Sequence, residues 1–214
     1  MSLQSDYAYE EIKNMIFRME LLPGDRIPEM QIAAKLGISR TPIHDALRRL
    51  QAEDLVIIRS NRGAEVRFFT DDEVKDIGAI RLAQDILSIK LAAYYGCASD
   101  FDKLRAIADA CEAAAASGNK YERIRLDMDF HLYITEIGRN ERLLQQQRSL
   151  YQQVHLIQIS KYTDVHHSLM QISHHLPLIE AIQRGNISEA NKLAALHLKD
   201  FFRIEPYLIK QYLA

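Results

Sequence analysis

Residues 29 to 69 read EMQIAAKLGISRTPIHDALRRLQAEDLVIIRSNRGAEVRFF, and this stretch decides the fold of the N-terminal part of the chain. Two segments of helical periodicity flank a turn at Gly37, and two short runs rich in β-branched and aromatic residues flank residues 60–63. Asn and Gly in that second turn tolerate the positive φ angles of a tight hairpin. The order helix, turn, helix, hairpin predicts a winged helix-turn-helix, which places its second helix in a groove of DNA.

The second helix of this motif can be built from its residues. Thr41 is predicted to cap the helix, and Pro42 suits the first helical position, where no backbone N–H is needed. Apolar residues at i, i+3, i+4 and i+7 form one face, and donor-rich side chains able to reach phosphates and base edges form the other. The apolar residues are Ile43, Ala46, Leu47 and Leu50. The predicted DNA-binding residues, including the hairpin tip, are Ser39, Arg40, Thr41, His44, Arg48, Arg62 and Gly63.

Composition and charge restrict the other possibilities. The chain has 214 residues and a formal net charge of −2, but residues 35–67 hold seven basic and four acidic side chains, a local excess of three positive charges. A basic face on a near-neutral chain fits a regulator that must also release DNA. Cys97 and Cys111 lack metal-type spacing, and no apolar run approaches the ~18 residues of a membrane span. With no visible signal peptide, we expect a reduced, cytoplasmic protein.

A second domain, entirely helical, is predicted to begin near residue 70. Thr70 and Glu73 form a capping-box pattern, and no stretch with the period of a strand follows. The predicted helices span roughly residues 6–21, 71–96, 100–117, 120–138, 140–160, 164–183, 188–203 and 206–213. We therefore expect a mainly α protein, in which residues 1–70 form the winged helix-turn-helix and residues 71–214 form an antiparallel helical bundle.

Inward-facing polar residues are the second functional signal. Asp127 and His131 lie four apart on a face that also carries apolar residues, and His197 lies on the apolar stripe of its helix. His175 aligns less clearly with apolar residues, because Pro177 can start or kink a helix. Three imidazoles and one carboxylate suit Zn²⁺, Ni²⁺, Mn²⁺ or Fe²⁺ with open coordination positions.

The same residues also admit a purely structural interpretation. An inward histidine is often only a hydrogen-bonded core residue, and Asp127 and His131 could pair with each other. Arg81 lies on the inward stripe of its helix and needs an anion, which could be Asp85 one turn on or a bound ligand. Four further histidines are predicted at the surface or in an outer shell: His155, His166, His167 and His174.

The N-terminal motifs resemble those of the GntR family of bacterial regulators. The matching stretches are LLPGDRI, LGISRTPIHDALRRLQAEDLV and RGAEV. They are similar to the family patterns P-G-x-x-L, L-G-V-S-R-T-P-V-R-E-A-L-x-x-L-x-x-E-G-L-V and R-G-x-x-V. The family usually has Arg-Glu where this chain has His44 and Asp45. The resemblance suggests that this Arg contacts DNA, so phosphate or guanine contacts would weaken or become pH-sensitive here.

The C-terminal part resembles the FCD ligand-binding domain of FadR-like regulators. DMDFH, HLPLIEAI and ANKLAALH match the metal motifs of that domain, and GRN matches the turn that follows the first motif. The resemblance implies that a divalent metal is held by Asp127, His131, His175 and His197. The family's first-helix motif is R-x-x-x-E. Here Arg81 keeps the spacing, but the shorter Asp85 replaces the glutamate.

These observations predict a DNA-binding transcriptional regulator, which we expect to be a repressor. A homodimer through the helical domain would present two winged helices to the half-sites of a palindromic double-stranded operator. A small organic acid would complete the coordination of the metal, pair with Arg81 and lower operator affinity. We do not expect an enzyme, because no general base or nucleophile motif accompanies the histidines. Three alternatives stay open from the residues: a regulator whose effector is the metal ion, a helical metallohydrolase, and a structural interaction module.

Overall fold

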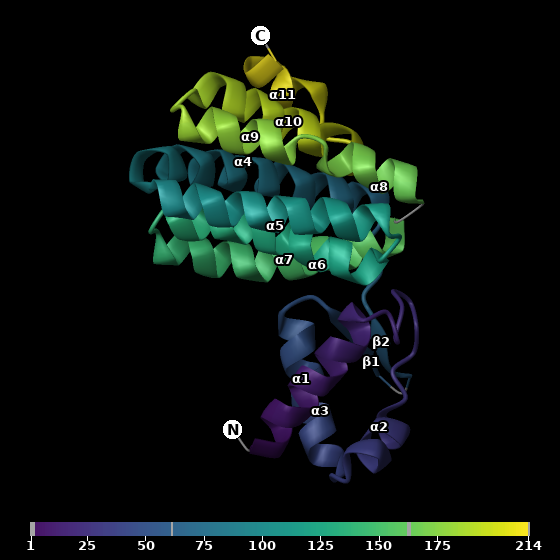
Figure 1. Cartoon of the computed structure of the whole chain (residues 1–214). Coiled ribbons are helices and arrows are strands. Elements are labelled where there is room, and N and C mark those ends of the chain that lie inside the picture. Colours follow the sequence, from purple (N-terminus) through teal and green to yellow (C-terminus); the bar gives the residue numbers. More distant parts are fainter. Residues whose placement is uncertain (1–2, 61, 162–163, 214) are drawn as a thin grey trace. The chain divides into compact units, whose positions relative to one another are not determined.

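The protein is mainly helical, as the sequence predicts. The computed structural model of the chain describes residues 3–60, 62–161 and 164–213. Its elements form a winged helix-turn-helix followed by a C-terminal helical domain (Figure 1). The chain forms two compact units, one of residues 1–68 with 152–161 and one of residues 69–151 with 162–214.

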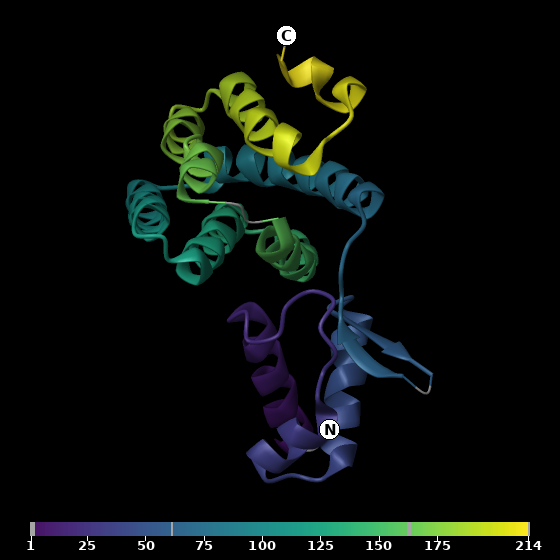
Figure 2. The same cartoon turned by 90° about the vertical axis from the view of Figure 1, so that its right-hand side faces the viewer.

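The first unit contains three helices and a two-stranded sheet. Its elements are α1 (Leu3–Phe17), α2 (Glu29–Leu36), α3 (Arg40–Ala52), β1 (Val56–Arg59) and β2 (Gly63–Val66). Helices α1 and α2 and strand β1 all pack against α3, so α3 is the centre of the unit. Figure 2 shows the β1–β2 hairpin extending beside these helices.

Helix α3 begins two residues earlier than the sequence pattern indicated. Ser39, with an extended backbone (φ −75°, ψ 173°), is the N-cap, and Arg40 is the first helical residue. The prediction of Thr41 as the cap is therefore wrong. Pro42 still lies in the first turn, where backbone N–H groups have no partner inside the helix, so its position costs no hydrogen bond.

The hairpin has the predicted antiparallel arrangement. Val56 pairs with Val66 and Arg59 with Gly63, which has a positive φ of 81°. Asn61, the other residue predicted to tolerate positive φ in this turn, lies outside the described residues. The segment before α2 joins the hairpin through an isolated bridge between Arg26 and Glu65. This pairing fixes that segment beside β2.

The second unit is built from helices only, within the described residues. They are α4 (Asp71–Tyr95), α5 (Ala98–Ala116), α6 (Lys120–Ile137), α7 (Glu141–Lys161, to Tyr151 in this unit), α8 (Val165–Ile172), α9 (His175–Gln183), α10 (Ile187–Phe202) and α11 (Pro206–Leu213). Helix α5 packs on α6, and α10 packs on α4, α9 and α11. Apolar side chains from α4, α5, α6, α9 and α10 share one core. The predicted capping box opens α4, since Glu73 N donates to Thr70 Oγ1 at 3.3 Å and Thr70 N donates to Glu73 Oε2 at 2.8 Å.

One predicted helix is in fact two. The single helix expected over residues 164–183 is interrupted at Ser173 and His174, where α8 ends and α9 begins. Pro177 explains the break, because proline has no N–H to donate and is tolerated only in the first turn of a helix. The break makes His175 the first residue of α9.

The expectations about the cysteines and about membrane-spanning segments can be compared with the structure. Cys97 is exposed, Cys111 is buried, and both are free thiols. Among the described residues, no helix is long and apolar enough to cross a membrane.

Replacing Gly78 by Ala tests the packing of α4 against α10. Alanine normally stabilises a helix interior relative to glycine by ~0.5–1 kcal/mol. A Cβ at this position, however, would lie 2.4 Å from the Cβ of Phe202 on α10. We therefore expect a net loss of about 1–3 kcal/mol in the free energy of unfolding, measured by urea denaturation at one protein concentration. A variant at least as stable as the wild type would show that the two helices separate easily.

Candidate metal centre and DNA-binding face

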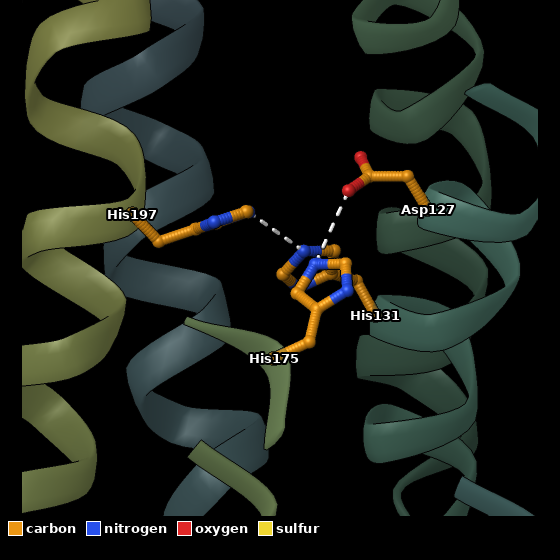
Figure 3. Close-up of side chains that lie close together, drawn as sticks. All are labelled: Asp127, His131, His175 and His197. Atoms are coloured by element: carbon orange, nitrogen blue, oxygen red, sulfur yellow. Dashed lines mark hydrogen bonds and ion pairs between the residues drawn. The ribbon is translucent and has the colours of Figure 1, made fainter. Parts of the chain in front are cut away.

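Four polar side chains from three helices meet inside the helical domain. Asp127 and His131 are one turn apart on α6, and both are buried. His175 comes from the start of α9 and His197 from α10. One donor atom of each residue lies within 4.8 Å of the other three (Figure 3). We call these four residues the Asp-His cluster; the structure brings together the set that the sequence singled out.

Hydrogen bonds fix the protonated nitrogen of one imidazole. His131 Nε2 lies 3.1 Å from His197 Nε2, and His175 Nε2 lies 3.3 Å from Asp127 Oδ1. His197 Nδ1 lies 2.8 Å from the carbonyl oxygen of Gln171. Because a carbonyl oxygen only accepts, Nδ1 carries the proton, and neutral His197 presents a bare Nε2 lone pair to the cluster. Metal-binding histidines are oriented in the same way.

The donor set fits a divalent cation. Donor atoms about 2.1 Å from one ion lie within roughly 4.2 Å of one another. The 4.8 Å spread of the cluster therefore requires only small side-chain movements. His175 Nδ1 is buried and has no hydrogen-bond partner among the described residues, so a polar atom remains that an ion or ligand could satisfy.

Burial sets the charges of the Asp-His cluster. It lowers the pKa of His131 and of His197 well below the usual histidine range, and it lowers the pKa of His175 as well. Burial raises the pKa of Asp127, but the Arg123 guanidinium and the hydrogen bond from His175 outweigh it and hold that pKa well below its usual range. Neutral imidazoles and an ionised carboxylate are the forms that bind metals.

A buried polar network adjoins the cluster at His131. Its Nδ1 lies 3.7 Å from Asp85 Oδ2. Gln147 Nε2 donates to Asp85 Oδ1 at 3.0 Å, and the Tyr151 hydroxyl donates to the same oxygen at 2.9 Å. Thr135 in turn donates to the side-chain oxygen of Gln147. Asp85 thus faces the His131 nitrogen that points away from His197, where the second partners of metal-binding histidines lie.

Arg81, the predicted effector-binding residue, is already paired with a carboxylate of the protein. It is 1% exposed, and its Nε donates to the Tyr151 hydroxyl at 3.0 Å and to Asp85 Oδ2 at 3.3 Å. The intramolecular pairing with Asp85 that the sequence left open is therefore present. Arg81 Nη2 is buried without a hydrogen-bond partner among the described residues. One end of the guanidinium is thus available to a ligand.

A small cavity lies beside the cluster. His131, His197, Asp85 and Ser88 provide its polar wall, and aliphatic side chains complete it. Its volume of about 10 Å³ is close to the space that one water molecule needs. An organic ligand would therefore require side chains around the cavity to move.

Helix α3 has the two faces that the sequence predicts. The four apolar residues of its inner face, Ile43, Ala46, Leu47 and Leu50, are all 0% exposed. Six predicted DNA-binding residues are exposed: Ser39, Arg40, Thr41, His44, Arg48 and Arg62. The seventh, Gly63, is half-buried. The arrangement leaves the donor-rich side of α3 open to a partner.

A groove of about 630 Å³ lies between α2, α3 and the hairpin. Arg40 and His44 line it, and so do Arg26 and Arg59, which were not predicted. Arg26 reaches the groove because its segment pairs with β2, a contact between residues distant in the sequence. The only signal for it was the arginine within PGDRI. Three arginines along one groove suit contacts with phosphates.

The remaining histidines differ in burial. His166 and His167 are exposed, and His174 is half-buried with its ring 6.2 Å from that of His197. The surface or outer-shell position predicted for His155 is wrong, since it is 2% exposed and stacks on Phe17 at 4.3 Å. The last turns of α7 belong to the first unit, and the sequence gave no sign of that division.

Comparison with known families agrees with both parts of the structure. Residues 4–66 match the family described as "Bacterial regulatory proteins, gntR family", and residues 76–200 match the FCD domain. The chain therefore belongs to the GntR family of DNA-binding transcriptional regulators and carries an FCD effector-binding domain. GntR regulators are transcription factors, so the metallohydrolase and interaction-module alternatives do not hold. Members of the family commonly form dimers.

Relatives and solved structures support this membership. The HTH-type transcriptional regulator YdhC of Bacillus subtilis is 27% identical over 190 residues, which cover 88% of this chain and 85% of the relative. The "probable D-xylose utilization operon transcriptional repressor" of Paenarthrobacter nicotinovorans is 27% identical over 177 residues, which cover 82% and 76%. A solved GntR transcriptional regulator from Rhodococcus sp. RHA1 has a TM-score of 0.84 at 19% identity, covering 99% and 98%, which shows a shared fold.

The lowered histidine pKa values predict how stability depends on pH. In metal-free protein, the unfolded chain takes up protons as pH falls below about 6.5, while the folded imidazoles of the Asp-His cluster stay neutral. The free energy of unfolding should therefore fall with pH below 6.5, by up to about 1.4 kcal/mol per pH unit for each histidine. Denaturation in the presence of a chelator measures this slope. His197→Gln should reduce the slope, and the exposed control His166→Gln should keep it; equal slopes in all three proteins would contradict the pKa assignment.

Proposed function

We propose that this protein is a repressor whose affinity for its operator responds to a small organic acid bound at a metal-containing pocket in the helical domain. The observation that carries the proposal is the buried Asp-His cluster in a chain that also has a winged helix-turn-helix. The relative from Paenarthrobacter nicotinovorans is described as a probable transcriptional repressor, which supports the direction of regulation.

The exposed face of α3 is the proposed reader of DNA. Arg40 and Arg48 would contact phosphates or base edges, and Arg62 at the hairpin would contact a phosphate or enter the minor groove. His44 would donate with less charge and reach than the arginine usual at its position. In a homodimer, two such faces would bind the two half-sites of a palindromic operator.

The Asp-His cluster would hold a divalent ion such as Zn²⁺, Ni²⁺, Mn²⁺ or Fe²⁺. When bound, such an ion supplies Lewis acidity and open coordination positions that a carboxylate can fill. The chain's own part is to orient the donors. The Gln171 carbonyl holds the tautomer of His197, and Asp85 faces the outer nitrogen of His131. Burial keeps the three imidazoles neutral and ready to bind.

The effector would pair with Arg81 through the guanidinium nitrogen that has no protein partner. The cavity holds about one water molecule, so we propose that an entering carboxylate takes over part of the contact that Asp85, which lines the cavity, makes with Arg81. That exchange would disturb Gln147 and Tyr151 on α7, which both donate to Asp85. A coupling of ~1–3 kcal/mol would change operator occupancy about 5–150-fold.

A second candidate is a regulator whose effector is the metal ion itself. The small cavity and the existing pairing of Arg81 with Asp85 favour it, since neither leaves an obvious place for an organic acid. The two candidates share the Asp-His cluster and differ in what changes operator affinity.

Changing Arg40 and Arg48 together to Ala tests the DNA-binding face. Each lost contact to a base edge costs about 1–3 kcal/mol, and each lost phosphate contact lowers the salt dependence of binding. We expect at least about tenfold weaker binding to a DNA fragment selected from random sequence by the wild type, measured by fluorescence anisotropy at several salt concentrations. The control changes Arg142 and Arg184, both exposed on the helical domain, and should bind as wild type does. Normal binding by the Arg40, Arg48 variant would overturn the assignment.

Elemental analysis of the purified protein tests the metal site. We expect about one divalent ion per chain, and none in a variant with Asp127→Ala and His131→Ala. His166→Gln is the matched control, since its imidazole is exposed and outside the cluster. Loading of the wild type should raise its melting temperature, and the double variant should not respond. Absence of metal from wild type even after loading would leave the cluster as core polar residues.

The two candidate effectors are then separated by DNA binding. If the organic acid is the effector, metal-loaded protein binds the selected DNA fragment and releases it when a suitable carboxylic acid is added. If the ion is the effector, removing and restoring the metal changes affinity with no acid present.

A further inference from the structure

Helix α2 places one long apolar side chain on its outer surface. Met30, in the first turn of the helix, is 69% exposed, whereas Ile32 and Ala33 are buried in the first unit. Because Met30 and Ile32 are two positions apart, they lie on nearly opposite sides of α2, at about 100° per residue. The packing of α2 on the rest of its unit therefore does not depend on Met30.

Met30 lines the groove between α2, α3 and the hairpin. The other exposed residues along this groove, within the part of the chain that the structure describes, are all polar. They are Arg26, Gln31, Arg40, His44, Arg59 and Ser60. A thioether side chain offers a phosphate neither positive charge nor an N–H donor. Met30 therefore suits an apolar group on the DNA that enters the groove.

The charges along the groove separate two kinds of DNA contact. Arg26 and Arg59 are exposed and cationic, as contacts to phosphates require. Glu29, next to Met30 in the sequence, also lines the groove, and its Oε2 lies 4.0 Å from His44 Nε2. A carboxylate repels phosphate oxygens. The part of the groove beside Glu29 and His44 therefore favours base edges over the DNA backbone.

We propose that Met30 is a specificity-determining residue, which contacts the 5-methyl group of a thymine in the major groove of the operator. The proposal rests on the proposed function, in which the exposed face of α3 reads DNA. The thymine methyl is the apolar group that base pairs present in the major groove, and cytosine lacks it. Methionine suits this contact, because its unbranched side chain and polarizable sulfur adapt to an apolar surface. The contact would favour T·A over C·G at one position of each half-site.

Replacing thymine by uracil tests the contact, because the two bases differ only in the methyl group. The probe is the DNA fragment that the wild type selects from random sequence, with each thymine of both strands replaced in turn. We expect one thymine in each half-site whose replacement raises the dissociation constant about fourfold, as the loss of roughly one buried methyl group predicts. Met30→Ala should weaken binding to the unmodified fragment and should abolish the effect of uracil at that thymine. Fluorescence anisotropy measures both.

Two control variants separate recognition of the methyl group from a general loss of binding. Met30→Leu keeps an apolar side chain of similar volume and should keep the sensitivity to uracil. Met170→Ala removes a methionine that is 60% exposed on α8 of the helical domain, and it should behave as the wild type does. Equal effects of uracil on the wild type and on Met30→Ala at every thymine, or a selected fragment without T·A pairs, would overturn the proposal.

Failure of this contact is distinguishable from failure of the proposed function. If the Arg40, Arg48 double variant loses DNA binding while Met30→Ala responds to uracil as the wild type does, the DNA-binding face stands and the thymine contact is refuted. If the Arg40, Arg48 variant binds the selected fragment normally, the assignment of the α3 face as the reader of DNA fails instead. Neither result affects the metal site.

Discussion

An ionised carboxylate held away from water is the constraint on which the helical domain depends. Asp127 is 1% exposed, and removing such a charge from water costs several kcal/mol unless partners replace the lost hydration. The Arg123 guanidinium and the imidazole of His175 supply that replacement, one from its own helix and one from the start of α9. The compensation works only while α6 and α9 keep their relative position. The contact between Asp127 and His175 therefore links α6 to α9 beside the apolar core that both helices share.

A second buried carboxylate extends the same principle. Asp85 accepts hydrogen bonds from Arg81, Gln147 and Tyr151 and lies 3.7 Å from His131, which also belongs to the Asp-His cluster. The two polar groups thus share one imidazole. A change in the charge or coordination of His131 would change the electrostatic field at Asp85, 3.7 Å away, and a rearrangement of Asp85 would change the field at His131. We propose that ligand binding at the cluster would reach α7 through this shared imidazole.

Local signals in the sequence were enough for most of the elements and for the four cluster residues, because helical periodicity identifies inward positions and family motifs selected among them. They missed the break between α8 and α9. Contacts between residues distant in the sequence could not be predicted from local signals. Arg26 lines the groove through pairing with β2, and His155 is buried by α7 joining the first unit. The shift of the α3 cap to Ser39 reflects a competition between two good capping residues that only backbone angles decide. The ion pair between Arg81 and Asp85 was left open by the sequence, since spacing alone cannot distinguish pairing with a carboxylate of the protein from pairing with a bound anionic ligand.

The distribution of the four cluster residues along the chain has a consequence for the order of folding. Asp127 and His131 come from one turn of α6, whereas His131 and His197 are 66 residues apart in the sequence. An ion held by the cluster would join α6, α9 and α10 as a crosslink does. It would close a long loop of chain, and closing that loop costs conformational entropy. A partly folded chain with α10 undocked offers at most three donors. Metal binding would therefore follow the docking of α10 during folding, and only chains in which α10 has docked would hold the ion with all four residues.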